Sequence, residues 1–164
     1  MVEATAYHEA GHAVARWWLN LRFKEASIIP DSAEGTLGHV EGTKWPKWFN
    51  PEINRDSPYV RRYAENVIIS RFAGQIAEQK YRGRRPKRDT HHHDDQCAVK
   101  LAIYFREGET LEAFLKYLFL CSRNLVEGRW PEIGRVAAAL LRNQRLTYED
   151  VIVATTPPAK LPKE

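Results

Sequence analysis

The N-terminal segment holds two histidines and a glutamate at a spacing that suits metal chemistry. His8, Glu9 and His12 form the pattern H-E-x-x-H. On a helix, side chains four residues apart project from one face about 6 Å apart, as two ligands of one tetrahedral zinc ion require. Glu9 lies about 100° around the helix from His8, where its carboxylate can reach a zinc-bound water. Zinc lowers the pKa of such a water toward roughly 7, so the pattern predicts hydrolysis with Glu9 as general base.

A zinc site of this kind needs a third protein ligand and an open fourth position. The segment THHHDDQCAVKLA, residues 90–102, gathers histidines and carboxylates at the start of an expected helix. The competing interpretation is an acidic first turn that suits the helix dipole, with exposed histidines. The one other histidine, His39, lies in an expected strand. Residues 90–102 are therefore the main source of a third ligand.

The expected elements place the first histidine pair on a helix near a small sheet. Apolar residues recur at helical spacing over residues 3–20, which sets the two histidines one turn apart. Gly11, between them, lets a second backbone come close. Two short strands are expected in ASIIP (26–30) and GTLGHVEG (35–42). The segment 42–57 has two prolines, two tryptophans and no period, which predicts a loop.

The second half of the chain is predicted to be helical. Apolar spacing predicts a long helix over about residues 58–80 and another over roughly 130–143. Capping residues mark the expected helix starts: Ser57, Thr90, Thr110, and Thr147 with Asp150.

Length and composition fit a single domain. The chain has 164 residues, of which 43% are hydrophobic, enough to close one core. We expect a mostly α (α+β) domain over residues 1–155, with a small sheet or hairpin in its N-terminal half and a flexible tail at 156–164. No run of about 18 apolar residues is present, so we expect no transmembrane segment and a cytoplasmic location.

The net charge of +4 is concentrated in RGRRPKR, residues 82–88. A solvated basic loop is favoured over a patch for nucleic acid or anionic lipid. No aromatic residue that could stack on bases interrupts these charges, which disfavours nucleic-acid binding. Cys97 and Cys121 are far apart and too few for a disulfide framework, so two buried, reduced thiols are expected.

Several short motifs follow one another along the chain. They are AYHEAGHAV (6–14), IIP (28–30), GTLGHV (35–40), FAGQIAEQ (72–79) and DDQCAVKLA (94–102). In this order they resemble the zinc peptidase domain of the FtsH family of ATP-dependent, membrane-bound proteases. The closing LVEGRWPEIGRVAAALLRNQRLTYEDV is also similar to the family's last helices, so the resemblance covers nearly the whole chain. It implies a helical, zincin-like peptidase fold, zinc as cofactor, and protein or peptide substrates.

The resemblance also implies roles for individual residues. In that family two histidines and an aspartate hold the zinc, and the glutamate between the histidines is the general base. On this chain they correspond to His8, His12 and Asp94, with Glu9 as base. The family's alanine, four residues after the aspartate, selects Asp94; Asp95 misses that register by one residue.

Two further positions follow from the same resemblance. Glu78 occupies a place where it either orients a zinc-bound imidazole or is an ordinary surface residue. The strand 35–40 resembles the family's strand at the rim of the cleft, where an extended substrate could pair with its backbone. His39 then faces either the cleft or the solvent.

The chain departs from the family in two respects. It has neither transmembrane helices nor a Walker-type GxxxxGK sequence, so unfolding of substrates would need a separate ATPase or adaptor partner. His91, His92 and His93 stand where the family has small and amide residues. They either add a fourth ligand that closes the open position or lie in solvent.

Two functions are therefore expected as alternatives. The first is a stand-alone zinc metalloendopeptidase that hydrolyses unfolded or flexible segments. The second is a catalytically silent, zinc-binding interaction or regulatory module, with Trp45, Trp48 and the basic loop as its partner surface. Nucleic-acid binding through residues 82–88 ranks last.

Overall fold

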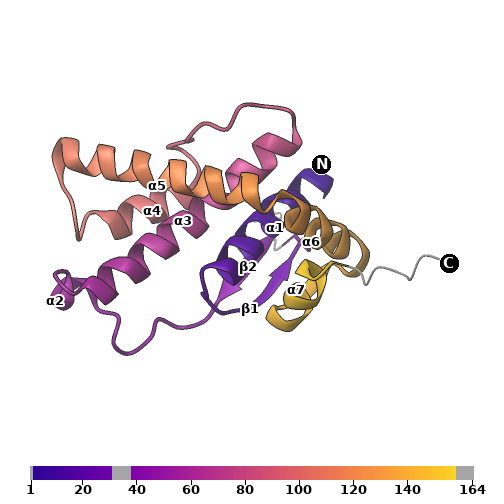
Figure 1. Cartoon of the computed structure of the whole chain (residues 1–164), viewed down its shortest axis with the longest axis horizontal. Coiled ribbons are helices and arrows are strands. Elements are labelled where there is room, and N and C mark those ends of the chain that lie inside the picture. Colours follow the sequence, from indigo (N-terminus) through magenta and orange to yellow (C-terminus); the bar gives the residue numbers. More distant parts are fainter. Residues whose placement is uncertain (1, 31–37, 158–164) are drawn as a thin grey trace.

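The computed structural model, which describes residues 2–30 and 38–157, is mostly helical with one small antiparallel sheet (Figure 1). This confirms the expected mostly α (α+β) class. The helices are α1 (Val2–Trp18), α2 (Pro51–Asn54), α3 (Pro58–Tyr81), α4 (His93–Ala102), α5 (Gly108–Gly128), α6 (Trp130–Asn143) and α7 (Tyr148–Thr155). The strands are β1 (Phe23–Ser27), β2 (His39–Gly42) and β3 (Arg145–Thr147).

The first helix, α1, is the central element of the fold. It packs against α3, α6, α7 and the sheet, and its alanines are buried. A Cβ at Gly11 would lie 2.6 Å from the carbonyl oxygen of Ala73 on α3, so the close approach of the two helices requires a glycine, as predicted. The helix ends at Trp18. Just beyond it, Asn20 has a left-handed φ of 56°, which lets the Leu21 N–H donate to the Arg16 carbonyl at 2.8 Å.

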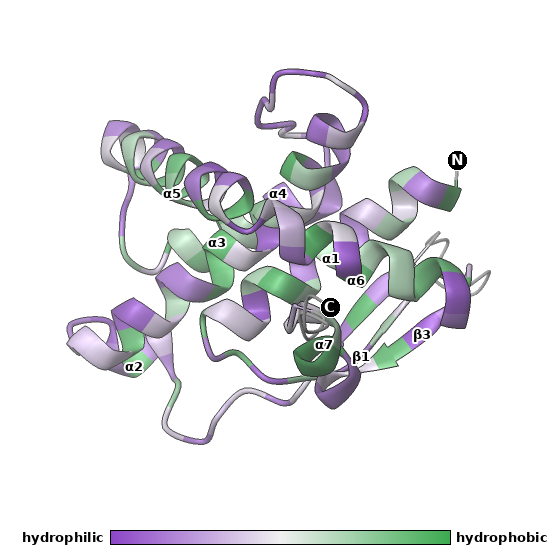
Figure 2. Cartoon of the chain, turned by 45° about the vertical axis from the view of Figure 1, so that its right-hand side comes forward, coloured by the Kyte–Doolittle hydropathy of each residue, from purple (hydrophilic) through white to green (hydrophobic). Residues whose placement is uncertain are grey.

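Helices α3, α4 and α5 pack together on one side of α1. Their apolar residues lie at helical spacing, and Figure 2 shows the resulting mixture of hydrophobic and hydrophilic positions around α5. Phe72 of α3 and Phe119 of α5 meet edge to face, with ring centroids 5.4 Å apart. Burying each such ring stabilises the fold by about 1.5–3 kcal/mol. This contact therefore helps to hold α3 between α5 and α1.

The sheet has the order β2-β1-β3, with β1 antiparallel to both neighbours. Ala26 lies opposite Val40 on one side and Leu146 on the other. The expected first strand at 26–30 is wrong in its bounds, because β1 begins at Phe23 and ends at Ser27. Phe23 and Ala26 are buried, but the exposed Lys24 and half-buried Glu25 between them hide the start of the strand from the apolar pattern. The third strand was not predicted, since three residues are too few to show a period.

Two helix starts differ from the prediction. Helix α4 is capped by His92 and not by Thr90: the His92 imidazole Nδ1 accepts from the Asp94 N–H at 3.2 Å. Helix α5 begins at Gly108, which places Thr110 inside the first turn.

Other local predictions can be compared with the structure directly. The expected loop contains the short helix α2, capped by the Asn50 side chain. The capping pair of Thr147 and Asp150 at α7 is confirmed. Residues 35–37 of the second strand prediction, and 158–164 of the predicted tail, lie outside the described residues.

Within residues 2–30 and 38–157, no helix combines the length and the apolar character needed to cross a membrane. Cys97 and Cys121 are free thiols, as predicted, but both are half-buried, not fully buried.

Candidate metal centre

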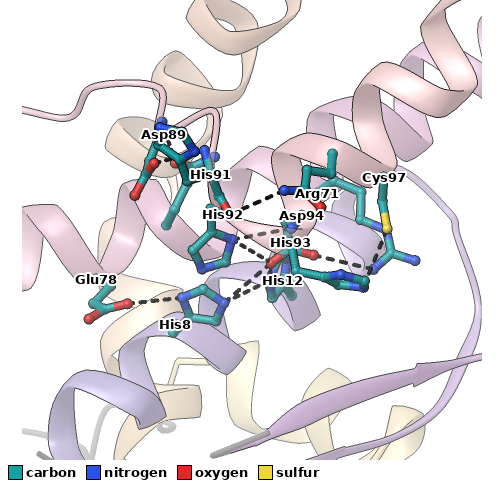
Figure 3. Close-up of polar contacts among 12 residues, drawn as sticks. His8, His12, Arg71, Glu78, Asp89, His91, His92, His93, Asp94 and Cys97 are labelled. Atoms are coloured by element: carbon teal, nitrogen blue, oxygen red, sulfur yellow. Dashed lines mark hydrogen bonds and ion pairs between the residues drawn. The ribbon is translucent and has the colours of Figure 1, made fainter. Parts of the chain in front are cut away.

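His8 and His12 from α1 and Asp94 from α4 bring three metal-binding atoms together (Figure 3). His12 Nε2 lies 3.1 Å from both His8 Nε2 and Asp94 Oδ2, and His8 Nε2 lies 3.5 Å from Asp94 Oδ2. Ligand atoms about 2.0–2.1 Å from a tetrahedral zinc ion lie about 3.3 Å from one another. The three sequence-predicted ligands therefore meet at a spacing that fits a tetrahedral metal site.

The outer nitrogen of each imidazole is held by a hydrogen bond. His12 Nδ1 donates to the carbonyl oxygen of Ser70 at 2.8 Å, and His8 Nδ1 donates to Glu78 Oε2 at 3.1 Å. With both protons on Nδ1, the Nε2 lone pairs point toward Asp94. Three acceptor atoms then face one another with no hydrogen between them. Such an arrangement is stable only with a cation in its centre, either a metal ion or a proton.

The electrostatics of the three residues agree with this requirement. Burial alone would lower the pKa of His8, but its hydrogen bonds to Asp94 and Glu78 raise that pKa to about 10. The hydrogen bond from His8 lowers the pKa of Glu78 to about 2. Although burial works in the opposite direction, His12 and His8 hold the pKa of Asp94 well below its usual range. Without a metal, a proton on His8 supplies the missing positive charge, and a metal must displace it.

Glu9 lies beside the three donor atoms but does not belong to their group. It is 4% exposed and lines the same cleft. Its Oε1 lies 3.0 Å from the position that a Cβ on Gly38 would take, so it sits close to the chain leading into β2. Burial raises the pKa of Glu9, against the opposing effect of the two histidines. A carboxylate with a raised pKa suits a general base that works near neutral pH.

Asp94 and Asp95 point to different partners, although they are neighbours. Asp95 is 1% exposed and receives hydrogen bonds from Nε and Nη2 of Arg88, the latter at 3.3 Å. Successive side chains on a helix point about 100° apart, so Asp94 faces the two histidines while Asp95 faces Arg88. Arg88 belongs to the basic segment 82–88, which was expected to be a solvated loop. One charge of this segment is therefore paired with a buried carboxylate.

Replacing Arg88 by methionine is expected to lower the free energy of unfolding by about 3–5 kcal/mol, because it leaves the Asp95 carboxylate buried and unpaired. Urea denaturation followed by circular dichroism measures the change. Arg84→Met, an exposed position in the same segment, is the matched control. A loss below about 1 kcal/mol for Arg88→Met would show that the buried pair does not stabilise the fold.

Glu78 contacts His8, which agrees with the first of the two alternatives that the resemblance implied for it. Its carboxylate accepts from His8 Nδ1 and also from Arg82 Nε, at 3.1 and 2.9 Å. Removing such a partner frees the imidazole to turn and typically weakens metal binding 10–100-fold.

Glu78→Ala is therefore expected to reduce zinc affinity by about 10–100-fold in a competition titration with a chromogenic chelator. Glu127→Ala is the control, since Glu127 pairs with Lys80 outside the cleft. Equal affinity in the two variants would contradict a role for Glu78 in orienting His8.

The three consecutive histidines do not enlarge the donor group. His91 is exposed, and His93 Nε2 lies 3.4 Å from Cys97 Sγ. His92 caps α4, with its ring centroid 5.2 Å from that of His8. Among the described residues, the group that could hold a metal contains three protein ligands and no fourth.

Three features of the site were not anticipated. The Ser70 carbonyl that holds His12 is a backbone group and leaves no signal in the sequence. Arg71 Nη1 lies 3.3 Å from Asp94 Oδ1, on the side away from the histidines. A Cβ at Gly74 would lie 2.2 Å from His12 Nε2, so only glycine leaves room for the ring. Gly74 is part of the motif FAGQIAEQ at 72–79, and this motif was the only feature of the sequence that could have pointed to it.

The metal group opens into a cleft of about 870 Å³. The cleft runs between α1 and the edge strand β2, which contributes His39, Val40 and Gly42 to its wall. His39 therefore faces the cleft; its side chain is 37% exposed. An edge strand beside the site can pair with an extended chain.

Comparisons of the chain with protein-family models and with curated protein sequences find no match.

Proposed function

We propose that the protein is a zinc-dependent metalloendopeptidase that hydrolyses unfolded or flexible protein segments. One observation carries the proposal: His8 Nε2, His12 Nε2 and Asp94 Oδ2 converge at 3.1–3.5 Å. The Nδ1–H groups of the two imidazoles point away from this group, to Glu78 and to the Ser70 carbonyl. Two imidazoles and one carboxylate, with a fourth position left for water or substrate, form a donor set typical of catalytic zinc.

When bound there, zinc would polarise a peptide carbonyl and lower the pKa of a water, so that the water can lose a proton and attack that carbonyl. Glu9, which lines the same cleft, would take the proton from that water and return it to the leaving amine. Glu78 and the Ser70 carbonyl hold the two imidazoles in orientation throughout. Gly38 keeps the wall beside Glu9 open, because a larger residue would collide with its carboxylate.

The shape of the cleft supports extended substrates. Among the residues that the structure describes, strand β2 pairs with β1 alone, and its residues line the cleft. Main-chain pairing with β2 would hold a peptide without demanding a particular sequence, which suits unfolded segments. Folded substrates would require a separate ATPase or adaptor partner to open them.

The test is hydrolysis of a quenched, fluorescently labelled casein by protein loaded with one equivalent of zinc. Cleavage should disappear after treatment with a chelator and return when zinc is restored. Cleavage that survives complete removal of the metal would contradict the proposal.

The second candidate is a catalytically silent, zinc-binding interaction module. It is favoured by Trp45 and Trp48, which are 55% and 52% exposed and pack beside Phe49 and Tyr63. Stable zinc binding without cleavage of any unfolded protein would select this alternative.

A further inference from the structure

One end of the metal cleft carries two arginines. Arg16 follows His8 and His12 at intervals of four residues on α1, so it lies on the same face, about 6 Å along the helix beyond His12. Arg71 of α3 lines the same cleft and contacts Asp94. Both arginines therefore line the same cleft as the metal group, within a few residues of a peptide bond held there.

Arg16 has no acidic partner among the described residues. Its Nη2 donates to the carbonyl oxygen of Arg22 at 2.9 Å, while its Nε is buried without a hydrogen-bond partner. Burial, and then the positive charge of Arg71, lower the pKa of Arg16. A guanidinium in this position gains from any carboxylate that enters the cleft.

Arg71 is only partly neutralised by its own contact. Its Nη1 lies 3.3 Å from Asp94 Oδ1, but Asp94 Oδ2 faces the two histidines. A metal on that side would share the charge of Asp94, and the guanidinium has five N–H donors, of which this contact uses one. The Arg71 side chain is 41% exposed, so its other donors remain within reach of a ligand.

The other carboxylates of the cleft within residues 2–30 and 38–157, Glu9 and Glu78, do not neutralise this end. Glu78 is held by His8 and Arg82, and Glu9 lies next to Gly38. Strand β2 runs alongside α1 from there: a Cβ at Gly42 would lie 3.6 Å from Arg16 Nη2. An extended peptide on β2, rising about 3.3 Å per residue, passes Glu9 first and reaches Arg16 two or more residues later.

We propose that Arg16 and Arg71 form a carboxylate-binding subsite that selects peptides with an acidic group within a few residues of the cleaved bond. The inference rests on the proposed peptidase function and names its substrate class. The carboxylate comes either from an aspartate or glutamate side chain or from the C-terminus of the substrate.

Binding of labelled peptides tests the subsite without relying on cleavage. The probes are fluorescein-labelled ten-residue peptides that differ only in a central Glu or Gln and in a C-terminal acid or amide. They are titrated at low salt against the zinc-loaded Glu9→Gln protein, and binding is followed by fluorescence anisotropy. The carboxylate should tighten binding about tenfold. The Glu/Gln pair reports a side-chain source, and the acid/amide pair reports a C-terminal source.

Adding Arg16→Gln to the same protein should bring this ratio close to one. Arg84→Gln is the matched control: Arg84 is exposed and does not line the cleft, so the ratio should persist. Equal affinities for all four peptides, or a preference that survives replacement of both Arg16 and Arg71, would overturn the subsite.

Hydrolysis of the same peptides by the parent protein separates the two proposals. Cleavage of all four at equal kcat/KM would reject the subsite and retain the peptidase. A carboxylate-dependent affinity without cleavage of any peptide or unfolded protein would retain the subsite and reject the peptidase.

Discussion

Replacing Glu9 by glutamine is expected to lower the rate of peptide hydrolysis about a thousandfold, with one zinc ion still bound per chain. Glutamine has nearly the same shape as glutamate but cannot accept a proton from the attacking water. Zinc should remain because Glu9 is not among the three converging donor atoms. The measurement combines the initial rate on labelled casein with metal analysis of the same sample.

Glu3→Gln on the same helix is the matched control, because Glu3 is exposed and accepts a hydrogen bond from Tyr81. Its rate should equal that of the parent. If the Glu9→Gln protein cleaved as fast as the parent, Glu9 would not be the general base, and another residue of the cleft would have to take its place.

Gly74→Ala is expected to reduce zinc affinity by about 100-fold or more while the chain remains helical. The added methyl group would lie 2.2 Å from His12 Nε2 and 2.6 Å from two carbon atoms of the same ring. The ring cannot simply turn away, because its other nitrogen is held by the Ser70 carbonyl one turn earlier on α3. The metal-binding nitrogen must therefore leave its position.

The matched control is Gly128→Ala at the end of α5, where an added Cβ meets nothing within 4 Å. Both variants introduce the same methyl group into a helix, so propensity effects are similar. Zinc affinity is measured by competition with a chelator, and helicity by circular dichroism. Unchanged affinity in Gly74→Ala would show that the metal does not lie where His12 Nε2 points.

The local part of the site could be predicted from the sequence. His8 and His12 share a helical face because their spacing is fixed by the helix itself, and Gly11 contacts α3 as expected. Asp94 is a different case, since its contact with His12 spans 82 residues of chain. Helical periodicity cannot bring two such segments together, so only the ordered motifs selected Asp94 over Asp95.

The remainder of the site depends on tertiary contacts that no pattern contains. The Ser70 carbonyl reaches His12 only because α3 packs closely on α1 at Gly11. Arg71 and Arg16 come from different helices and meet only at the cleft. The sheet was underestimated for the same reason, because β3 is defined by its pairing with β1 and not by its own three residues.

Zinc stoichiometry of the parent and of Asp94→Ala is the most direct test of the central claim, that His8, His12 and Asp94 hold one metal ion. Both proteins would be incubated with excess zinc, desalted and analysed for metal, with circular dichroism confirming that both are folded. We predict one equivalent of zinc in the parent and less than about a tenth of an equivalent in Asp94→Ala. No zinc in the parent, or a full equivalent retained without Asp94, would contradict the metal centre and the function built on it.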